Sequence, residues 1–281
     1  MQALDLTQFA TAISLGPDGI WRPPSVEAIS YPAEGNDACF AVEEHSFWFG
    51  HRNACIAALL ERFRDEVCDA PFADIGGGNG FVALAVQRLG LPTLLVEPGP
   101  AGAARAKARG LDSVVEGTLV SCGFREGTLA AAGMFDVVEH IADDEAFLRE
   151  AARALRPGGL IFLTVPCYPA LWSHEDEAAG HQRRYTAASM RALLQRSGLD
   201  EVYLTHFFRP LPPLIALVRV LPYRLGIAAA RIEAETVSRD HRPAGASGML
   251  GQLLAPEVEL IRAGQSMAFG GSLLVAARKP V

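Results

Sequence analysis

The sequence predicts an α/β fold in which a doubly wound, mostly parallel sheet is covered by helices on both faces. Short apolar runs alternate with helix-like segments from Phe72 to Ala277, and this alternation is typical of right-handed strand–helix–strand units. A glycine-rich turn at 76–80 directly follows the first run. Half of the 281 residues are apolar and a fifth are charged, which is typical of a folded globular chain.

Four parts can be distinguished along the chain. Residues 1–50 are punctuated by proline and glycine, and we interpret them as an N-terminal extension or cap. Residues 51–208 form the expected core, and 209–268 form an insertion without a β pattern that we interpret as a lid. Residues 269–281 return to the core as its final strand, which would pair with the run 202–207 and add an antiparallel terminal strand.

The elements of the core follow one another at short intervals. Ile56, Leu59, Leu60 and Phe63 form one apolar stripe, which predicts a helix over 52–64. The turn 156–159 is rich in glycine and proline and is expected to lead directly into a strand. Strands are predicted at 72–75, 93–96, 114–115, 129–135 and 160–165, and helices at 81–89, 101–109, 143–155 and 186–196.

Charge and cysteine content argue against several classes of protein. The formal net charge is −7 and no Lys/Arg run occurs, so no nucleic-acid partner is predicted. The five cysteines are scattered without a Cys-x-x-Cys pair, so neither a zinc site nor a disulfide framework is indicated. The chain start lacks the basic-then-apolar build of a secretory signal, and we expect a cytoplasmic protein with reduced thiols.

The stretch 211–230 is the most apolar part of the chain. It contains Arg219 and Arg224 and three prolines, whereas a spanning helix needs about 20 nearly uninterrupted apolar residues. No transmembrane span is therefore predicted. A buried lid helix is the favoured interpretation, and an amphipathic segment at a lipid surface is the alternative.

The glycine-rich turn and two acidic residues predict a nucleotide site. Asp74 ends the first strand, and the turn 76–80 lets a ligand approach the backbone at the positive end of the next helix. Glu97 ends the second strand, where a carboxylate can accept hydrogen bonds from both hydroxyls of a ribose. A nicotinamide cofactor is the second choice, because Phe81 occupies the place of its third glycine, and no P-loop lysine follows.

Four motifs in this order resemble those of the class I S-adenosylmethionine-dependent methyltransferases, a Rossmann-like family. Residues 72–80 resemble their first motif, and Glu97 matches their ribose-binding position. The stretch 135–141 (FDVVEHI) is similar to the segment after their fourth strand, and 155–159 (LRPGG) to the turn before their fifth. The segments 44–52 and 171–185 resemble a bacterial subgroup of small-molecule methyltransferases.

The resemblance implies S-adenosyl-L-methionine as cofactor, with S-adenosyl-L-homocysteine as its product. The segment 116–118 would lie beside the adenine, where relatives often carry an aspartate that this chain lacks. The residues expected to bind the cofactor are Asp74, Gly76, Gly78, Asn79, Glu97, Pro98, Gly117, Thr118 and Asp136.

The expected reaction is O-methylation of a partly hydrophobic metabolite or natural-product intermediate. A hydroxyl acceptor benefits from a base, and histidine is the usual choice near neutral pH. His140 and His181 are the candidates, although a structural role of His140 in its turn is a slightly better alternative. No metal is predicted, because Asp143 and Asp144 fit a helix N-terminus instead.

Residues near the first helix and after the fifth strand are candidates for acceptor contact. The alternative for the aromatic ones is core packing, and for the charged ones a network that pins the loop by ion pairs. Two other functions stay open: a module that binds the cofactor without turnover, and a protein methyltransferase. A homodimer is a possible assembly. The candidate contacts are Trp48, Arg52, His174, Asp176, Arg184 and Tyr185.

Overall fold

A computed structural model describes residues 4–25, 40, 43–226 and 247–281 of the chain. Within these residues the strands join into a single nine-stranded sheet. The strands are β1 (Ser14–Leu15), β2 (Trp21–Arg22), β3 (Phe72–Ile75), β4 (Thr93–Glu97), β5 (Val114–Glu116), β6 (Leu129–Phe135), β7 (Leu155–Pro166), β8 (Asp200–Phe207) and β9 (Ser272–Arg278).

The strand order is β1-β2-β5-β4-β3-β6-β7-β9-β8. The neighbours from β5 to β7 are parallel, and β9 is antiparallel to both β7 and β8. This arrangement confirms the predicted mostly parallel sheet and its antiparallel terminal pair. The order reverses at β3, which lies between β4 and β6, so the carboxyl ends of these strands frame the crevice in which such sheets bind ligands.

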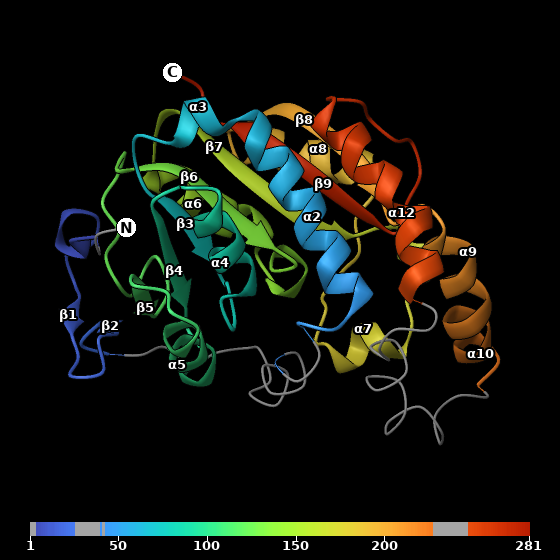
Figure 1. The fold of residues 1–281 in the computed structure, drawn as a ribbon, viewed down its shortest axis with the longest axis horizontal. Helices are drawn as coiled ribbons and strands as arrows, with labels where there is room; N and C mark the ends of the chain where they lie inside the picture. The colour runs from blue at the N-terminus through green and yellow to red at the C-terminus, as the bar shows by residue number, and fades with distance from the viewer. Residues whose placement is uncertain (1–3, 26–39, 41–42, 227–246) are drawn as a thin grey trace.

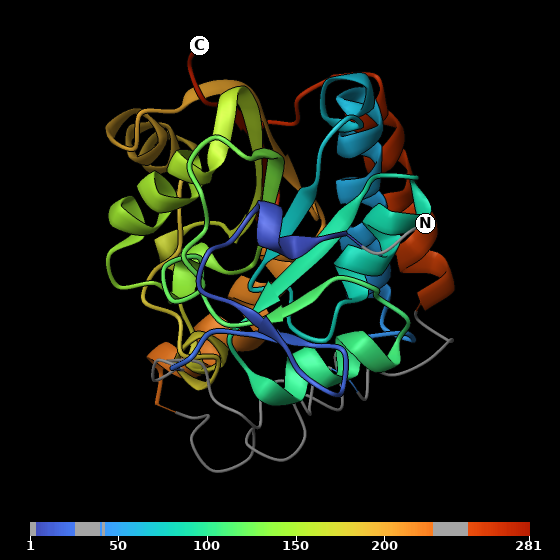
Figure 2. The same cartoon turned by 90° about the vertical axis from the view of Figure 1, so that its left-hand side faces the viewer.

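Helices cover both faces of the sheet, as Figures 1 and 2 show. α2 (Phe47–Arg62), α3 (Arg64–Val67), α4 (Phe81–Arg88), α5 (Pro100–Ala108) and α12 (Ser247–Arg262) lie on one face. α6 (Asp144–Ala154) and α8 (Ala187–Arg196) lie on the other. The short helices are η1 (Leu6–Gln8), η2 (Val138–His140), η3 (Pro169–Leu171), α7 (His174–Ala178), α9 (Leu211–Ile215), the π-helical η4 (Ala216–Val220) and α10 (Leu221–Arg224).

Burial on both faces explains why the central strands read as continuous apolar runs. Every residue of β3, β4 and β6 is buried. Phe72 and Phe162 face the layer of α2 and α12, whereas Ala73 and Ile161 face that of α6 and α8. Helix and strand positions therefore alternate as predicted for a sheet enclosed between two helical layers.

The first helix begins earlier than the sequence predicted. α2 begins at Phe47 rather than at residue 52, because the side chain of Ser46 accepts a hydrogen bond from the backbone N–H of Trp48 (3.2 Å) and caps the helix. The aromatic residues expected before the helix thus form its first turn. The other predicted helices of the core agree within one residue, and Asp143 caps α6 through the N–H of Ala146 (2.9 Å).

Two further segments differ from the prediction. The N-terminal extension contributes β1 and β2, and Trp21 of β2 pairs in parallel with Val115 of β5. Strands of two residues carry no detectable period, so the sequence could not show them. The predicted turn 156–159 stays within β7, because the segment pairs with Lys279 through the N–H of Gly158 (3.0 Å) and the carbonyl of Gly159 (2.9 Å).

The described part of the predicted insertion is helical and divides in two. α9, η4 and α10 follow one another at one end of the molecule, whereas α12 packs along α2 (Figure 1). Leu254 and Ile261 of α12 are buried in the same core as α2, so α12 belongs to the covering layer rather than to a lid. Residues 227–246 of the insertion lie outside the described residues. None of the helices in the described part of the chain is long and apolar enough to cross a bilayer.

Replacing Gly80 with alanine is expected to destabilise the protein by about 3 kcal/mol, as a sum of strain and overlap. Gly80 begins α4 with φ +76°, and a Cβ there would lie 2.7 Å from Leu111 Cδ1 and 2.9 Å from Ala106 Cβ. Gly110 is the matched control, since it has φ +93° but no atom within 4 Å of its Cβ position. Urea unfolding should show a loss of only about 1 kcal/mol for Gly110→Ala, and equal losses in both variants would contradict the packing argument.

Candidate active site

The Glu97 carboxylate is fixed at the carboxyl end of β4. Its Oε2 accepts a hydrogen bond from the N–H of Gly78 (2.9 Å) and its Oε1 accepts one from the N–H of Gly99 (2.7 Å). Burial raises the pKa of Glu97, and the two backbone N–H groups oppose this shift. Each oxygen keeps a free lone pair, so the carboxylate is oriented to accept two further hydrogen bonds from vicinal hydroxyls.

Asp74 lies beneath the glycine-rich turn and is almost completely buried. Burial raises its pKa to about 7, although the charge of Arg52 and a backbone hydrogen bond from Ala83 lower it. Its Oδ2 is buried without a hydrogen-bond partner among the described residues. A buried carboxyl without full compensation favours a nearby positive charge.

The glycines of the turn are required by the protein itself at two positions. Gly76 has φ +69°, and a Cβ there would lie 2.9 Å from Val137 Cγ2. Gly80 is enclosed by α5, as described above. At these two positions the left-handed backbone and close packing require glycine by themselves, apart from any role in ligand approach.

Glu43 lies beside the glycine-rich turn and was not predicted from the sequence. Its carboxylate accepts from Asn79 Nδ2 (2.8 Å) and pairs with Arg109 (2.6 Å). An acidic residue in an irregular segment carries no sequence signal for such a bridge. Asn79, expected to contact the cofactor, is thereby oriented by the segment that precedes α2.

The segment predicted beside the adenine follows β5. The N–H of Gly117 donates to the carbonyl of Glu97 (3.1 Å), which places Gly117 next to the end of β4. Thr118 forms a compact turn with Ser121, in which Thr118 N–H donates to Ser121 Oγ (2.9 Å). Glu116 pairs with Arg22 of β2 (2.9 Å), so the N-terminal strands support this side of the crevice.

Arg52 and Asp136 connect α2 to the end of β6. Asp136 adopts a left-handed backbone with φ +57°, and its carboxylate accepts from Arg52 and from Thr164 Oγ1 (2.9 Å). The Arg52 guanidinium lies 5.0 Å from the ring centre of Trp48 and 5.1 Å from that of Phe49. Arg52, a candidate for acceptor contact, is thus engaged with an acidic group of the protein itself.

Trp48 packs against two aromatic side chains, Phe208 and Phe49. Its ring stacks on Phe208 at 5.5 Å and meets Phe49 edge-on at 5.0 Å. Phe49 is buried, and Trp48 is half-buried. These contacts agree with the core-packing alternative for the aromatic cluster, while the half-buried indole keeps some surface beside Arg52.

A network centred on Asp176 holds the loop after α7. Asp176 is fully buried, and its Oδ1 accepts from His181 Nδ1 (2.8 Å) and from Arg184 Nε (2.7 Å). Burial alone would raise the pKa of Asp176, but these two hydrogen bonds and the charge of Arg184 hold it below its ordinary value. The ion pair of Arg184 with Asp176 agrees with the alternative, in which a network of ion pairs pins this loop.

The two candidate histidines lie together. The His140 and His181 rings meet edge-on with centres 4.8 Å apart. The N–H of Gln182 donates to the carbonyl of Glu139 (2.7 Å), which holds the loop of His181 against η2. Burial, and then the neighbouring His181, lower the pKa of His140 to about 4, so its imidazole is neutral near pH 7 and is a weak proton acceptor.

Asp176 and Tyr185 do not present themselves to an acceptor, which corrects the prediction of direct contact. Asp176 is enclosed, and Tyr185 is buried in the core with its hydroxyl donating to Asp144 (2.7 Å). Both therefore position the loop. His174 is more exposed and pairs with Glu177 (3.2 Å) on α7, apart from the pair formed by His140 and His181.

Comparison with known proteins identifies the family of this chain. A family model described as a methyltransferase domain matches residues 48–204. This chain belongs to that methyltransferase family. The predicted membership and the use of S-adenosylmethionine are confirmed at the level of the family, and the matched segment includes the glycine-rich turn, Glu97 and both histidines.

Relatives of this methyltransferase carry related names. It is 36% identical over 121 residues to a ubiquinone biosynthesis O-methyltransferase of Methylobacterium sp. (strain 4-46), which covers 38% of this chain and 47% of the relative. The Caulobacter vibrioides protein of the same name is 35% identical over 127 residues, again 38% and 47% of the two chains. The chain thus matches about half the length of these relatives.

Solved structures share the fold of this methyltransferase. A putative methyltransferase of Haloferax volcanii, solved in complex with the Trm112 activator, has a TM-score of 0.56 at 18% identity and covers 89% of this chain and 94% of its own. Phosphoethanolamine N-methyltransferase 2 of Haemonchus contortus, solved with S-adenosyl-L-methionine, has a TM-score of 0.56 at 19% identity, with 92% and 61% coverage. These likenesses concern the fold.

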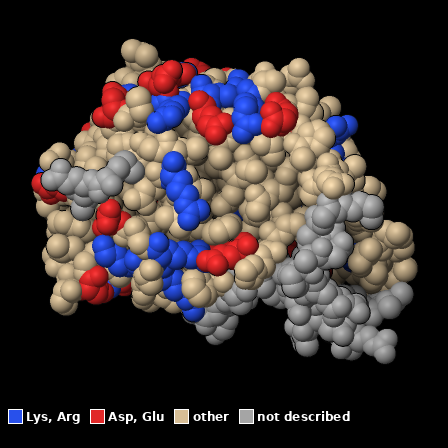
Figure 3. All heavy atoms as spheres, viewed as in Figure 1, with Lys and Arg blue, Asp and Glu red and all other residues tan. Residues whose placement is uncertain are grey.

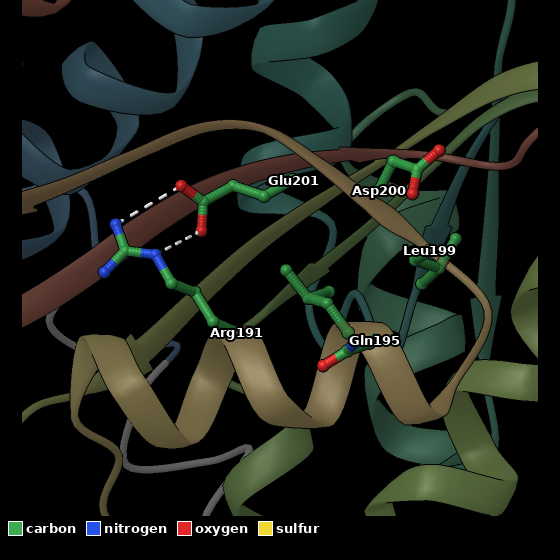
Figure 4. Close-up of a pocket in the computed structure, with 6 residues that line it drawn as sticks. Arg191, Gln195, Leu199, Asp200 and Glu201 are labelled. Carbon is green, nitrogen blue, oxygen red and sulfur yellow. Dashed lines mark hydrogen bonds and ion pairs between the residues drawn. The ribbon is translucent and has the colours of Figure 1, made fainter.

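Two surface features of this methyltransferase lie away from the site. On the face viewed in Figure 3, basic and acidic side chains gather close together. Among the ion pairs that join α2 and α12, Arg262 pairs with Glu61 (3.1 Å), and it also pairs with Glu259 (2.5 Å) within α12. A hollow at the start of β8 is bordered by Leu199 and Asp200 and by the ion pair of Arg191 with Glu201 (2.8 Å; Figure 4). It contains none of the predicted site residues and lies at the start of β8, the edge strand next to β9.

Proposed function

We propose that the chain transfers the methyl group of S-adenosylmethionine to an oxygen of a small molecule, a partly hydrophobic metabolite or natural-product intermediate. The Glu97 carboxylate is the observation that carries this proposal. It is held by two backbone N–H groups at the carboxyl end of β4, where it can accept both hydroxyls of a ribose. The residues proposed to hold the cofactor are Asp74, Gly76, Gly78, Asn79, Glu97, Pro98, Gly117, Thr118 and Asp136.

The transfer is an in-line displacement. The acceptor oxygen attacks the methyl carbon, and the carbon–sulfur bond breaks with its electron pair going to sulfur, which leaves the neutral thioether S-adenosylhomocysteine. A hydroxyl acceptor must also lose its proton. His140 and His181 lie just beyond the carboxyl end of β6, beside β3, and this placement supports their assistance in that step. The names of the relatives support oxygen as the acceptor atom.

The segment from α9 to α10 supports a hydrophobic acceptor. Leu214, Leu217 and Val218 are 50–64% exposed on these helices. Tyr223 Oη donates to Glu177 (2.6 Å), which ties the segment to α7 and to the loop of His181. An apolar surface of this kind beside the polar side chains of the His181 loop suits a molecule with an apolar body and a polar reacting end.

Removing the Glu97 carboxylate tests the proposal. Glu97→Ala should weaken binding of S-adenosylmethionine and S-adenosylhomocysteine about 100-fold or more in calorimetry, because each hydrogen bond to a charged group contributes about 1.5–3 kcal/mol. Glu201→Ala is the control, since Glu201 lies on the distant hollow. Unchanged affinity in Glu97→Ala would refute the cofactor assignment. Tight binding without mass gain in any hydroxylated acceptor would favour the module that binds without turnover.

Cofactor binding should release a proton from Asp74 below about pH 7. The unfolded carboxyl ionises near 3.8 and the folded one near 7, so the stability that Asp74 contributes is lost as pH rises between these values. A cationic cofactor favours the ionised form, so affinity should rise with pH by up to about tenfold per unit below pH 7. Asp74→Asn should flatten this profile, and exposed Asp69→Asn should not.

A further inference from the structure

We infer that Glu139, His140 and His181 bind one divalent transition-metal cation at the carboxyl end of β6. One ligand atom from each side chain can be chosen so that all three lie within 4.8 Å of one another. Ligands about 2.1 Å from a common ion lie at most about 4.2 Å apart, so small inward rotations complete the set. Two imidazoles and one carboxylate leave further coordination positions open.

Both imidazoles are held by one ring nitrogen, as in metal sites whose histidines are oriented from behind. His181 Nδ1 bonds to Asp176 Oδ1 (2.8 Å), which leaves Nε2 for a ligand. His140 has a hydrogen bond with the backbone of Gly180, the residue next to His181. Asp176 is itself fixed by Arg184 (2.7 Å) and by the N–H of Ser173 (2.9 Å). Asp176 therefore orients His181, and Arg184 and Ser173 in turn orient Asp176.

Glu139 contributes a buried carboxyl group to which no cation among the described residues is committed. Its side chain is 1% exposed, and its Oε2 has no hydrogen-bond partner among the described residues. The two arginines whose charges act on Glu139 are engaged elsewhere, Arg52 with Asp136 and Arg184 with Asp176. Isolated buried carboxylates are costly, and a bound cation would compensate this one.

A second cluster that could hold a metal is the group of His51, Cys55 and Glu257. There both carboxylate oxygens of Glu257 already accept backbone N–H groups, from Phe208 (2.7 Å) and Arg209 (2.8 Å), and His51 bonds to Oε2 (2.9 Å). Burial raises the pKa of Cys55, which keeps its thiol protonated. Satisfied groups have no need of an ion, so the inferred cation occupies the Glu139 cluster alone.

The ligand set indicates the class of metal. Imidazole suits zinc, iron, nickel and copper, whereas magnesium, calcium and manganese prefer oxygen ligands. The role of the ion rests on the proposed function, in which His140 and His181 then assist as ligands of the ion instead of as bases: the acceptor oxygen binds at an open position, where its hydroxyl loses the proton to solvent more readily before it attacks the methyl carbon. The existence of the site does not depend on that role.

Metal binding can be measured without any acceptor. Protein stripped with a chelator is titrated with zinc(II) by calorimetry and with cobalt(II) by visible absorption, and we expect one ion per chain. His181→Ala and Glu139→Gln should each lower the affinity by at least about 100-fold. Asp176→Asn should lower it about 10–100-fold, because it releases the orientation of His181.

Two histidine variants serve as matched controls. His174→Ala removes an imidazole that also pairs with a carboxylate, and His51→Ala removes one from the second cluster; both should bind zinc as wild type does. Titration with S-adenosylhomocysteine and circular dichroism check that each variant is folded, and a failure of that titration in wild type would affect the proposed function alone. No stoichiometric ion in wild type, or wild-type affinity in His181→Ala, would overturn the inference.

Discussion

The Arg52→Ala variant is expected to lose about 3–5 kcal/mol of its free energy of unfolding, because it removes one partner of a buried ion pair. Arg52 is 7% exposed, pairs with Asp136 and lies between two aromatic rings. Its charge also lowers the pKa of Asp74 and of Glu139. Since whole domains are stable by only about 5–15 kcal/mol, this loss should be visible as a large shift of the urea midpoint.

Two variants separate charge from geometry at this position. Arg52→Lys keeps the charge but not the planar group that lies over Trp48, so it should fall between wild type and alanine. Arg196→Ala removes an exposed arginine that pairs with Glu145 (2.8 Å), and should lose no more than about 1 kcal/mol. An Arg52→Ala protein as stable as Arg196→Ala would show that the pair with Asp136 contributes little.

The second large effect is expected at Glu257 of α12. Its carboxylate accepts the N–H groups of Phe208 and Arg209 at the end of β8, where Phe208 has φ +61°, a conformation that bulky residues rarely adopt. Glu257→Ala would leave two buried donors without acceptors, each costing about 1–3 kcal/mol. The melting temperature should fall by about 10 °C.

A conservative variant at this position tests the cause. Glu257→Gln retains the size of the side chain and one acceptor oxygen, so its melting temperature should lie between those of wild type and Glu257→Ala. The neighbouring exposed Glu259 pairs with Arg262, and Glu259→Ala should melt close to wild type. A Glu257→Ala protein that melts within about 2 °C of wild type would contradict the role of these bonds.

The elements predicted from the sequence were those with a long or repeated pattern. The stripe of Ile56, Leu59, Leu60 and Phe63 is buried as expected, and the seven residues of β6 were predicted with their observed bounds. The start of α2 was missed because Phe47 to Phe49 suggested a cap, while Ser46, a residue typical of helix N-caps, was the available signal.

Contacts between distant segments could not be predicted in the same way. The sequence predicted His140 and His181 as separate candidates, and their contact is visible only in the fold, which places the two rings together. Glu139 was noticed merely as part of a motif, although a carboxylate and an imidazole at adjacent positions after a strand could have suggested a metal ligand pair. Asp176 and Tyr185 were assigned to acceptor contact because polar residues are expected to be accessible. The burial of these two side chains leaves no local pattern in the sequence.

The short strands β1 and β2 protect one side of the molecule from other chains. β2 occupies the hydrogen-bonding edge of β5, and the outermost strand offers only Ser14 and Leu15. A border of two residues is too small a template for a foreign strand, whereas a bare β5 would present unpaired amide and carbonyl groups. Shortening the chain past Arg22 would therefore favour aggregation of otherwise folded molecules.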